Sequence, residues 1–376
     1  MKRRSFLGLS LLTATAATRG ADAAPAQRES RAVDPARLVV MGCDVSALTS
    51  SYVDFLHQSG VDVWCYNSPE TVRDFADTLN FLDQNSAKIV LVRSADQILA
   101  AKAAAKIAFV IGWQNSRAIE EAGGTDWRYS RPPKTTLRAY YEMGLRVANL
   151  CYNLANQFGG GNLDPTAPLT RAGAYLVSEM QEMGILVDCG GHTGEQTSLD
   201  IIRIARRPVV CTHSNVSVLN FNPRNGSDRL IEGIARTGGV FGVTAIDAFL
   251  NWGVKDAAKD PRRDRRPTVK VGRLVDDIDY IVRLVGADHV GLGPDFLEGY
   301  NTPGQPSFSV DPDQQFQFPR EMTYAQDKVQ YVDGFENVGQ LGNIRRELER
   351  RGYTAENIAK ILGGNWMRVY AAAWNG

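Results

Sequence analysis

Residues 184–215 read GILVDCGGHTGEQTSLDIIRIARRPVVCTHSN and contain two short apolar runs, ILVDCGG at 185–191 and PVVCTHSN at 208–215. A longer segment of helical period separates the two runs. Because each run is almost continuously apolar, it is typical of a parallel strand buried on both faces. The stretch therefore predicts a strand–helix–strand unit, with His192 and His213 at the ends of consecutive strands.

The same alternation of short apolar runs and helical segments continues along the chain. Eight or nine such units favour a single (β/α)8 barrel of the α/β class over an open doubly wound sheet. We therefore predict one barrel domain over residues 35–376. The further strand-like runs are 38–45, 61–67, 88–94, 107–113, 146–153, 239–246 and 289–296.

The helical segments between these runs are amphipathic, and several end in glycine, a common helix C-terminus. Examples are 169–184, 227–238 and 271–286. Two stretches break the alternation. The basic stretch 253–270 is expected to be a solvated loop, whereas 298–334 is either a lid or subunit contact, as in a homodimer, or irregular surface.

The charge balance limits the classes of partner that the protein is expected to bind. The chain has 42 basic and 42 acidic residues, so its formal net charge is zero. This balance disfavours nucleic acid and anionic membrane surfaces as partners and favours a small-molecule substrate. Past residue 20, no segment has the run of about 18 apolar residues that a membrane span requires.

The N-terminus, MKRRSFLGLSLLTATAATRGADAAPAQ, carries a pair of arginines before an apolar stretch and small-residue cleavage sites. This order is typical of a twin-arginine export signal, here predicted over residues 1–26. The alternative is an ordinary secretory signal that contains two arginines. Both place the mature protein in the periplasm or otherwise outside the cytoplasm.

The five cysteines are an odd number for an exported protein and are too widely spaced for a zinc knuckle. All of them fall in apolar, strand-like stretches, so we expect buried thiols rather than a disulfide framework. They are Cys43, Cys65, Cys151, Cys189 and Cys211.

Polar residues at strand ends are the candidates for chemistry, because the active site of a (β/α)8 barrel lies at the carboxyl ends of its strands. Two neutral imidazoles and a carboxylate suit zinc. Of the other histidines, His57 is predicted on an exposed helical face, and His289 opens its strand. The candidates are Cys43, Asp44, Gln114, Tyr152, His192, His213 and Asp295.

Several motifs in order carry a family resemblance: GLRVANLCYN, the stretch quoted above, NPRNGSDRLIEGIARTGGVFGVTA, GADHVGLGPDF and ILGGNWMRVY. Over about residues 38–372 the chain resembles the membrane (renal) dipeptidase family, peptidase family M19. The resemblance implies a (β/α)8 barrel with a two-zinc site that cleaves dipeptides, whose C-terminal carboxylate is held by an arginine.

Transferred to this chain, the resemblance assigns roles to four residues. His192 and His213 match the two histidines of the second zinc, although VDCGGH has one residue more than the family motif. Asp295 matches an aspartate that borders the first metal and transfers a proton. Arg224 matches the arginine that grips the substrate carboxylate.

The chain also departs from the family pattern. Where the family has D-G-H-x-D, residues 41–45 read MGCDV, so the first metal's histidine is missing and its aspartate is at best displaced to Asp44. Gln114 stands in place of the bridging glutamate. Tyr152 stands in place of a histidine, from where its hydroxyl would donate to the oxyanion.

Losing the bridging carboxylate removes a negative charge that two dications require. We therefore predict one zinc ion at most, on His192 and His213 with help from Asp295 or Gln114; Cys43 is the less favoured ligand. The predicted function is an exported dipeptidase-like metallohydrolase. The alternatives are a hydrolase of another small substrate, such as a lactone or modified dipeptide, and a catalytically silent binding protein.

Overall fold

A computed structural model of the chain describes residues 33–116, 118–119, 134–251, 268–299 and 329–374. The predicted export signal at 1–26 lies outside the described residues, as does most of the two irregular stretches at 253–270 and 298–334. The remaining predictions fall on residues that the structure describes.

Within the described ranges, nine parallel strands form the sheet, in the order β1-β2-β4-β5-β6-β7-β8-β9, with β3 paired alongside β4. The nine apolar runs of the sequence therefore all form strands. The strands are β1 (Val40–Asp44), β2 (Val63–Tyr66), β3 (Ile89–Leu91), β4 (Ile107–Trp113), β5 (Leu145–Asn149), β6 (Leu186–Asp188), β7 (Val209–Ser214), β8 (Phe241–Val243) and β9 (Val290–Leu292).

The two ends of this order meet through backbone hydrogen bonds just past the carboxyl ends of β1 and β9. The Asp295 amide donates to the Cys43 carbonyl at 3.0 Å, and the Val45 amide donates to the Phe296 carbonyl at 3.0 Å. Eight strands thus form a nearly closed ring, which confirms the predicted (β/α)8 barrel. The ninth strand, β3, is short and pairs with the first half of β4, whereas β5 pairs with its second half.

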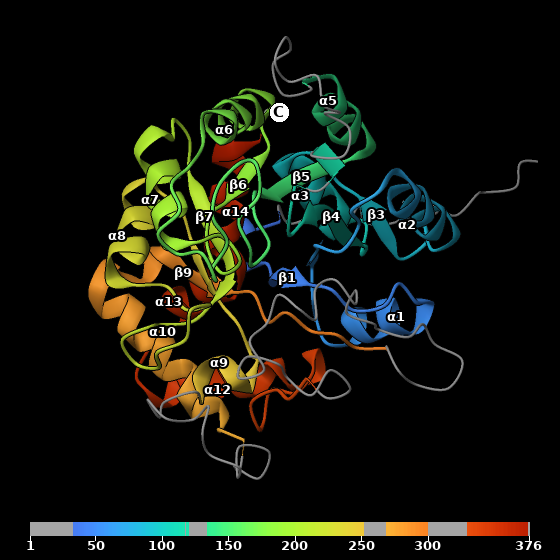
Figure 1. Cartoon of the computed structure of the whole chain (residues 1–376). Helices are drawn as coiled ribbons and strands as arrows, with labels where there is room; N and C mark the ends of the chain where they lie inside the picture. The colour runs from blue at the N-terminus through green and yellow to red at the C-terminus, as the bar shows by residue number, and fades with distance from the viewer. Residues whose placement is uncertain (1–32, 117, 120–133, 252–267, 300–328, 375–376) are drawn as a thin grey trace, which may run out of the picture. The chain divides into compact units, whose positions relative to one another are not determined.

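Helices surround the ring (Figure 1), and their buried apolar residues belong to the core that the strands form. The predicted helices are α6, α8 and α10, and α6 ends at Gly184 in the left-handed conformation with φ 83°. The helices are α1 (Ser50–Gln58), α2 (Val72–Gln84), α3 (Ala95–Ala103), α5 (Lys134–Met143), α6 (Arg171–Met183), α7 (Glu195–Ile204), α8 (Asp228–Arg236), α9 (Asp247–Leu250), α10 (Val271–Val285), α12 (Leu341–Arg350), α13 (Ala355–Ala359) and α14 (Asn365–Ala373).

The Trp366 ring of α14 is fully buried and fills the interior of the barrel below the strand ends that carry the candidate site. Its indole Nε1 donates to the Leu292 carbonyl at 3.1 Å. A Cβ at Gly42 of β1 would lie 2.3 Å from the Trp366 ring, so only glycine leaves room for it there. Trp366 therefore packs closely against β1 and β9, the strands that carry Cys43 and precede Asp295.

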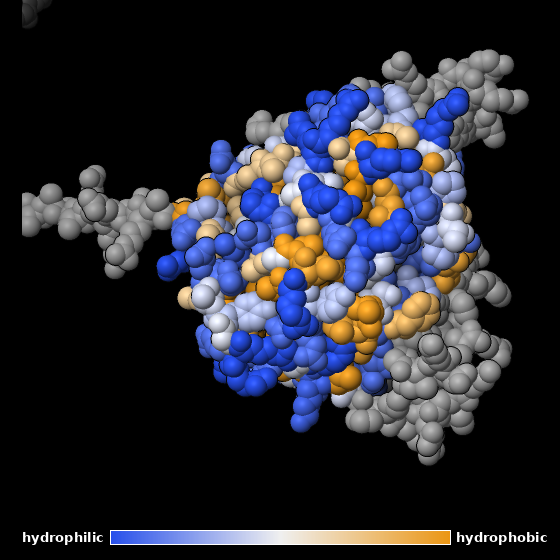
Figure 2. Space-filling model, turned by 90° about the vertical axis from the view of Figure 1, so that its left-hand side faces the viewer, coloured by the Kyte–Doolittle hydropathy of each residue, from blue (hydrophilic) through white to orange (hydrophobic). Residues whose placement is uncertain are grey.

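The outer surface carries mainly hydrophilic side chains on the face seen in Figure 2. Figure 2 shows the face that carries α6, α7, α8 and α10, where hydrophilic residues cover most of the surface and apolar residues occupy smaller areas between them. Within the described residues, no helix has the length and apolar character to cross a membrane. The five cysteines are all buried, as expected.

Candidate functional site

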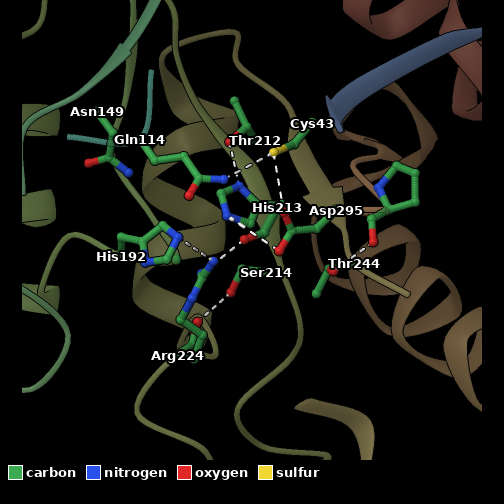
Figure 3. A network of polar contacts seen from close by, with 12 residues as sticks. Cys43, Gln114, Asn149, His192, Thr212, His213, Ser214, Arg224, Thr244 and Asp295 are labelled. Carbon is green, nitrogen blue, oxygen red and sulfur yellow. Dashed lines mark hydrogen bonds and ion pairs between the residues drawn. The ribbon is translucent and has the colours of Figure 1, made fainter. Parts of the chain in front are cut away.

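Three predicted side chains from distant parts of the sequence meet at the carboxyl end of the barrel. Cys43 is the last residue but one of β1, His213 lies near the end of β7 and Asp295 follows β9. Their donor atoms all lie within 4.8 Å of one another. The Cys43 Sγ is 3.7 Å from Asp295 Oδ1, and the His213 Nε2 is 4.0 Å from Asp295 Oδ2 (Figure 3). We call these three residues the strand-end cluster.

Asp295 is held in this position by its backbone. Its φ of 61° lies in the left-handed region, which a non-glycine residue adopts at some cost. Two hydrogen bonds fix this conformation. The Asp295 amide donates to the Cys43 carbonyl, and the Tyr331 hydroxyl donates to the Asp295 carbonyl at 2.9 Å. The carboxylate is therefore directed at Cys43 and His213 rather than along the strand.

A chain of hydrogen bonds sets the tautomer of His213. The Thr212 hydroxyl lies 2.5 Å from Asp188 Oδ2 and 2.7 Å from His213 Nδ1. Because the hydroxyl has a single proton, which it donates to the carboxylate, the His213 Nδ1–H must donate to the Thr212 oxygen. The lone pair of His213 therefore lies on Nε2, and this buried atom has no hydrogen-bond partner.

His192 is also buried, but both of its nitrogens are engaged. Its Nδ1 lies 2.9 Å from Asn153 Oδ1, and its Nε2 lies 3.1 Å from Arg224 Nη2. Since arginine only donates, Nε2 accepts and Nδ1 carries the proton. The Tyr152 ring stacks on the imidazole at a centroid distance of 3.9 Å. His192 is thus next to the strand-end cluster but directed at Arg224.

The Arg224 guanidinium lies between the two histidines. Its Nη1 donates to the His213 carbonyl at 3.0 Å while Nη2 donates to His192. Gly191, at φ +63°, is what permits this approach, because a Cβ there would lie 1.9 Å from Nη1. The extra residue of the VDCGGH motif therefore coincides with a glycine that makes room for a buried cation.

Two further predicted residues differ in their placement. Gln114, at the end of β4, donates from Nε2 to the Cys43 Sγ at 3.6 Å and so borders the strand-end cluster. Asp44 does not join it: its carboxylate accepts from the Tyr52 hydroxyl at 2.6 Å and from the Ser46 amide at 2.8 Å. Successive strand residues alternate in direction, so Cys43 takes the inward position and Asp44 faces α1.

Burial dominates the electrostatics of the site. It raises the pKa of the Cys43 thiol well above its usual value, with a further contribution from Asp295, and it raises the pKa of Asp295. Burial and the neighbouring Arg224 lower the pKa values of both His192 and His213, so both imidazoles are neutral. Burial thus disfavours the charged forms of Cys43 and Asp295, and a bound dication would favour those forms.

The donor set of the strand-end cluster fits a divalent metal. Thiolate sulfur, imidazole nitrogen and carboxylate oxygen are all ligands of zinc. The unpartnered Nε2 of His213 is the observation that supports a ligand there, because buried polar atoms nearly always have a partner. Cys43, the less favoured ligand in the sequence, thus lies in the cluster, whereas His192 does not.

Sequence reasoning missed the residues that orient the histidines. Asn153 holds Nδ1 of His192, and the pair Thr212 and Asp188 holds Nδ1 of His213. Asp188 gave a usable signal, because a carboxylate inside an apolar strand requires a buried partner. Asn153 has a positive φ of 58° and gave no comparable pattern.

Known proteins share sequence similarity with the chain along most of its length. The family model for membrane dipeptidase (peptidase family M19) matches residues 39–306 and 324–375. The chain is 30% identical over 263 residues to an uncharacterized protein in the pqqA 5' region of Klebsiella pneumoniae, covering 68% of this chain and 80% of that protein. It is 27% identical over 239 residues to Dipeptidase aclJ of Aspergillus oryzae, covering 62% of this chain and 47% of that protein.

A second fungal relative, Dipeptidase tcpJ of Claviceps purpurea, is 24% identical over 288 residues, covering 76% of this chain and 55% of that protein. The chain therefore spans about half the length of these two fungal dipeptidases.

Solved structures share the fold. A crystal structure of an amidohydrolase from Pseudomonas aeruginosa is similar with a TM-score of 0.75 and 24% identity, covering 90% of this chain and 97% of that one. A metallo peptidase from Rhodobacter sphaeroides, liganded with a phosphinate mimic of the dipeptide L-Ala-D-Ala, has a TM-score of 0.66 and 18% identity, covering 90% and 99%.

Proposed function

The chain belongs to the membrane dipeptidase family, peptidase family M19, and on this premise we propose that it is an exported metallohydrolase that cleaves the amide bond of dipeptides or related small substrates. The observation that carries the proposal is the strand-end cluster of Cys43, His213 and Asp295 beside a buried arginine. The dipeptide mimic bound by a structural relative supports the substrate class.

A zinc ion at this cluster would supply a Lewis acid and lower the pKa of a bound water. The chain's own residues supply the other functions. The Asp295 carboxylate accepts a proton from the attacking water and passes it to the leaving amine. Tyr152, stacked on His192, is placed at the same side of the barrel and donates its hydroxyl to the developing oxyanion.

Arg224 is the proposed partner of the substrate carboxylate. It is buried, which strengthens its attraction for an anion. The guanidinium is held by the His213 carbonyl and by His192, so its position is set before the substrate arrives. A preorganised cation of this kind loses little side-chain entropy on binding.

For the cellular location we propose the periplasm, and for the assembly a monomer or a homodimer. The twin-arginine pattern in residues 1–26 supports export to the periplasm, and the absence of net charge supports a small-molecule substrate rather than a nucleic acid. A homodimer is the alternative to a monomer, and sedimentation of the mature protein separates the two.

The test is a substrate panel with the metal-loaded protein: L,L- and L,D-dipeptides, a lactone and an N-acylated dipeptide. We expect amine release from dipeptides and a loss of at least about 100-fold in kcat/KM for His213→Ala. His57→Ala is the matched control, because His57 is exposed on α1 and its Nε2 lies 3.2 Å from the Ala105 carbonyl, outside the cluster. Turnover of the lactone alone would favour the second hydrolase class.

A catalytically silent binding protein is the third outcome. It would bind a dipeptide in equilibrium dialysis, lose that binding in Arg224→Met, and release no amine from any substrate. This reading is favoured by Gln114, since an amide does not serve as the base that activates water. The retained cluster of three donor atoms favours hydrolysis instead.

A further inference from the structure

We propose that the protein holds one divalent metal ion through the Cys43 thiolate, the His213 imidazole and the Asp295 carboxylate, and that the Arg224 guanidinium provides the second positive charge of the site. This inference rests on the proposed metal-dependent function and assigns its ligands. It replaces His192 by Cys43 in the ligand set expected from the sequence.

The separations of the donor atoms carry the first step. A tetrahedral zinc site with bonds of about 2.0–2.3 Å has ligand atoms about 3.3–3.6 Å apart. Here Cys43 Sγ and Asp295 Oδ1 are 3.7 Å apart, and His213 Nε2 and Asp295 Oδ2 are 4.0 Å apart. A rotation of the carboxylate and a small inward shift of the side chains would bring all three atoms into range.

The lone pair of His213 is the second and independent observation. Asp188 and Thr212 fix the proton on Nδ1, so Nε2 faces the cluster as an acceptor without a partner. Metal-bound histidines commonly have their other nitrogen held by a carboxylate or another acceptor. The arrangement Asp188–Thr212–His213 is a support of this kind, built for a ligand at Nε2.

His192 has no such vacancy. Its Nε2 accepts from Arg224, and a metal at this nitrogen would have to displace the guanidinium into a position beside another cation. Arg224 is also bonded to the His213 carbonyl and contacts the Phe249 ring at 5.3 Å, so it is held from three sides. His192 therefore positions Arg224 instead of binding the metal.

The charges favour a single ion. The thiolate and the carboxylate carry two negative charges, which balance one dication, and Gln114 adds none. The Gln114 Nε2 faces the Cys43 sulfur at 3.6 Å and donates to it, so it stabilises a thiolate. A second dication would be repelled by Arg224, and among the described residues the strand-end cluster contains no carboxylate besides Asp295.

Cobalt(II) is the probe for this proposal, because a thiolate ligand gives it an intense near-ultraviolet charge-transfer band. We expect one cobalt per chain with this band in the full mature protein. Cys43→Ser should lose the band and bind cobalt at least tenfold more weakly. Cys65→Ser is the matched control, because Cys65 is an equally buried strand thiol with Asn67 as its partner, and it should keep both.

Three results would overturn the proposal. One is a thiolate band that persists in Cys43→Ser, and another is two tightly bound cobalt ions that depend on His192. The third is metal-free hydrolysis that Cys43→Ser abolishes and iodoacetamide blocks, since Cys43 would then be a nucleophile. Circular dichroism and thermal unfolding of both serine variants identify any loss that comes from misfolding.

The cobalt experiment and the substrate panel can fail independently of each other. A thiolate-bound single cobalt with no turnover of any substrate would support the ligand assignment and contradict the hydrolase. Dipeptide cleavage by a metal-loaded protein that lacks the band would support the hydrolase and contradict the ligand assignment.

Discussion

The two histidines of the site have the same chemistry and different surroundings. His192, after β6, and His213, at the end of β7, are both buried and neutral with the proton on Nδ1. They differ at Nε2, which accepts from Arg224 in His192 and has no partner in His213. The role of a buried imidazole is thus decided by what faces its second nitrogen.

The largest expected difference between the two histidines is the effect of their removal on zinc affinity. His213→Leu should weaken zinc affinity by more than about 100-fold, because losing a ligand costs more than the 10–100-fold of an outer-shell partner. His192→Leu should weaken it by less than about tenfold. Competition with a chromophoric chelator measures both. Equal losses in the two variants would remove the distinction.

A double-mutant cycle tests the contact that distinguishes His192. Arg224→Met and His192→Leu should show a coupling of about 1–2 kcal/mol in the free energy of unfolding, since they share a buried hydrogen bond. The cycle of Arg224→Met with His213→Leu should give less than about 0.5 kcal/mol, because that contact is made by a backbone carbonyl. Urea unfolding of the metal-free protein measures both, and similar couplings would contradict this account.

The support of His213 should have a smaller effect than the ligand itself. Thr212→Val breaks the link between Asp188 and Nδ1 and should weaken zinc affinity about tenfold. Thr78→Val in α2 changes an equally buried threonine away from the site and should leave the affinity unchanged. An unaltered affinity in Thr212→Val would show that the tautomer is set by other means.

The two histidines should make similar contributions to the pH dependence of the free energy of unfolding. Both have lowered pKa values in the fold, so the unfolded chain binds protons that the native state does not as the pH falls below about 6.5. The stability that they contribute is present above this pH and is lost below it, by at most about 1.4 kcal/mol per pH unit for each histidine.

Urea unfolding of the metal-free protein at pH 6.5 and 5.5 measures this slope. Each of His192→Leu and His213→Leu should reduce the slope by about 1 kcal/mol per pH unit. A slope that only one of the two site variants reduces would show that the imidazoles differ in protonation as well as in partners.

Much of the fold follows from local pattern. The nine apolar runs are strands because a parallel strand covered on both faces must be continuously apolar, and the helices between them carry one apolar stripe and glycine or polar caps. The strand order confirms the predicted barrel, and the family model confirms the predicted family. The placement of β3 beside half of β4 was not predictable, since it depends on the register of two other strands.

The sequence by itself determined which strand ends carry Cys43, His213 and Asp295, because a barrel brings the carboxyl ends of all its strands to one face. Only the tertiary structure decided which side chains meet there. The alternation of β1 directs Cys43 inward and Asp44 toward α1, and a left-handed Gly191 admits Arg224 to the nitrogen of His192. Such choices depend on side-chain direction and on atoms far away in the chain, which no local pattern encodes.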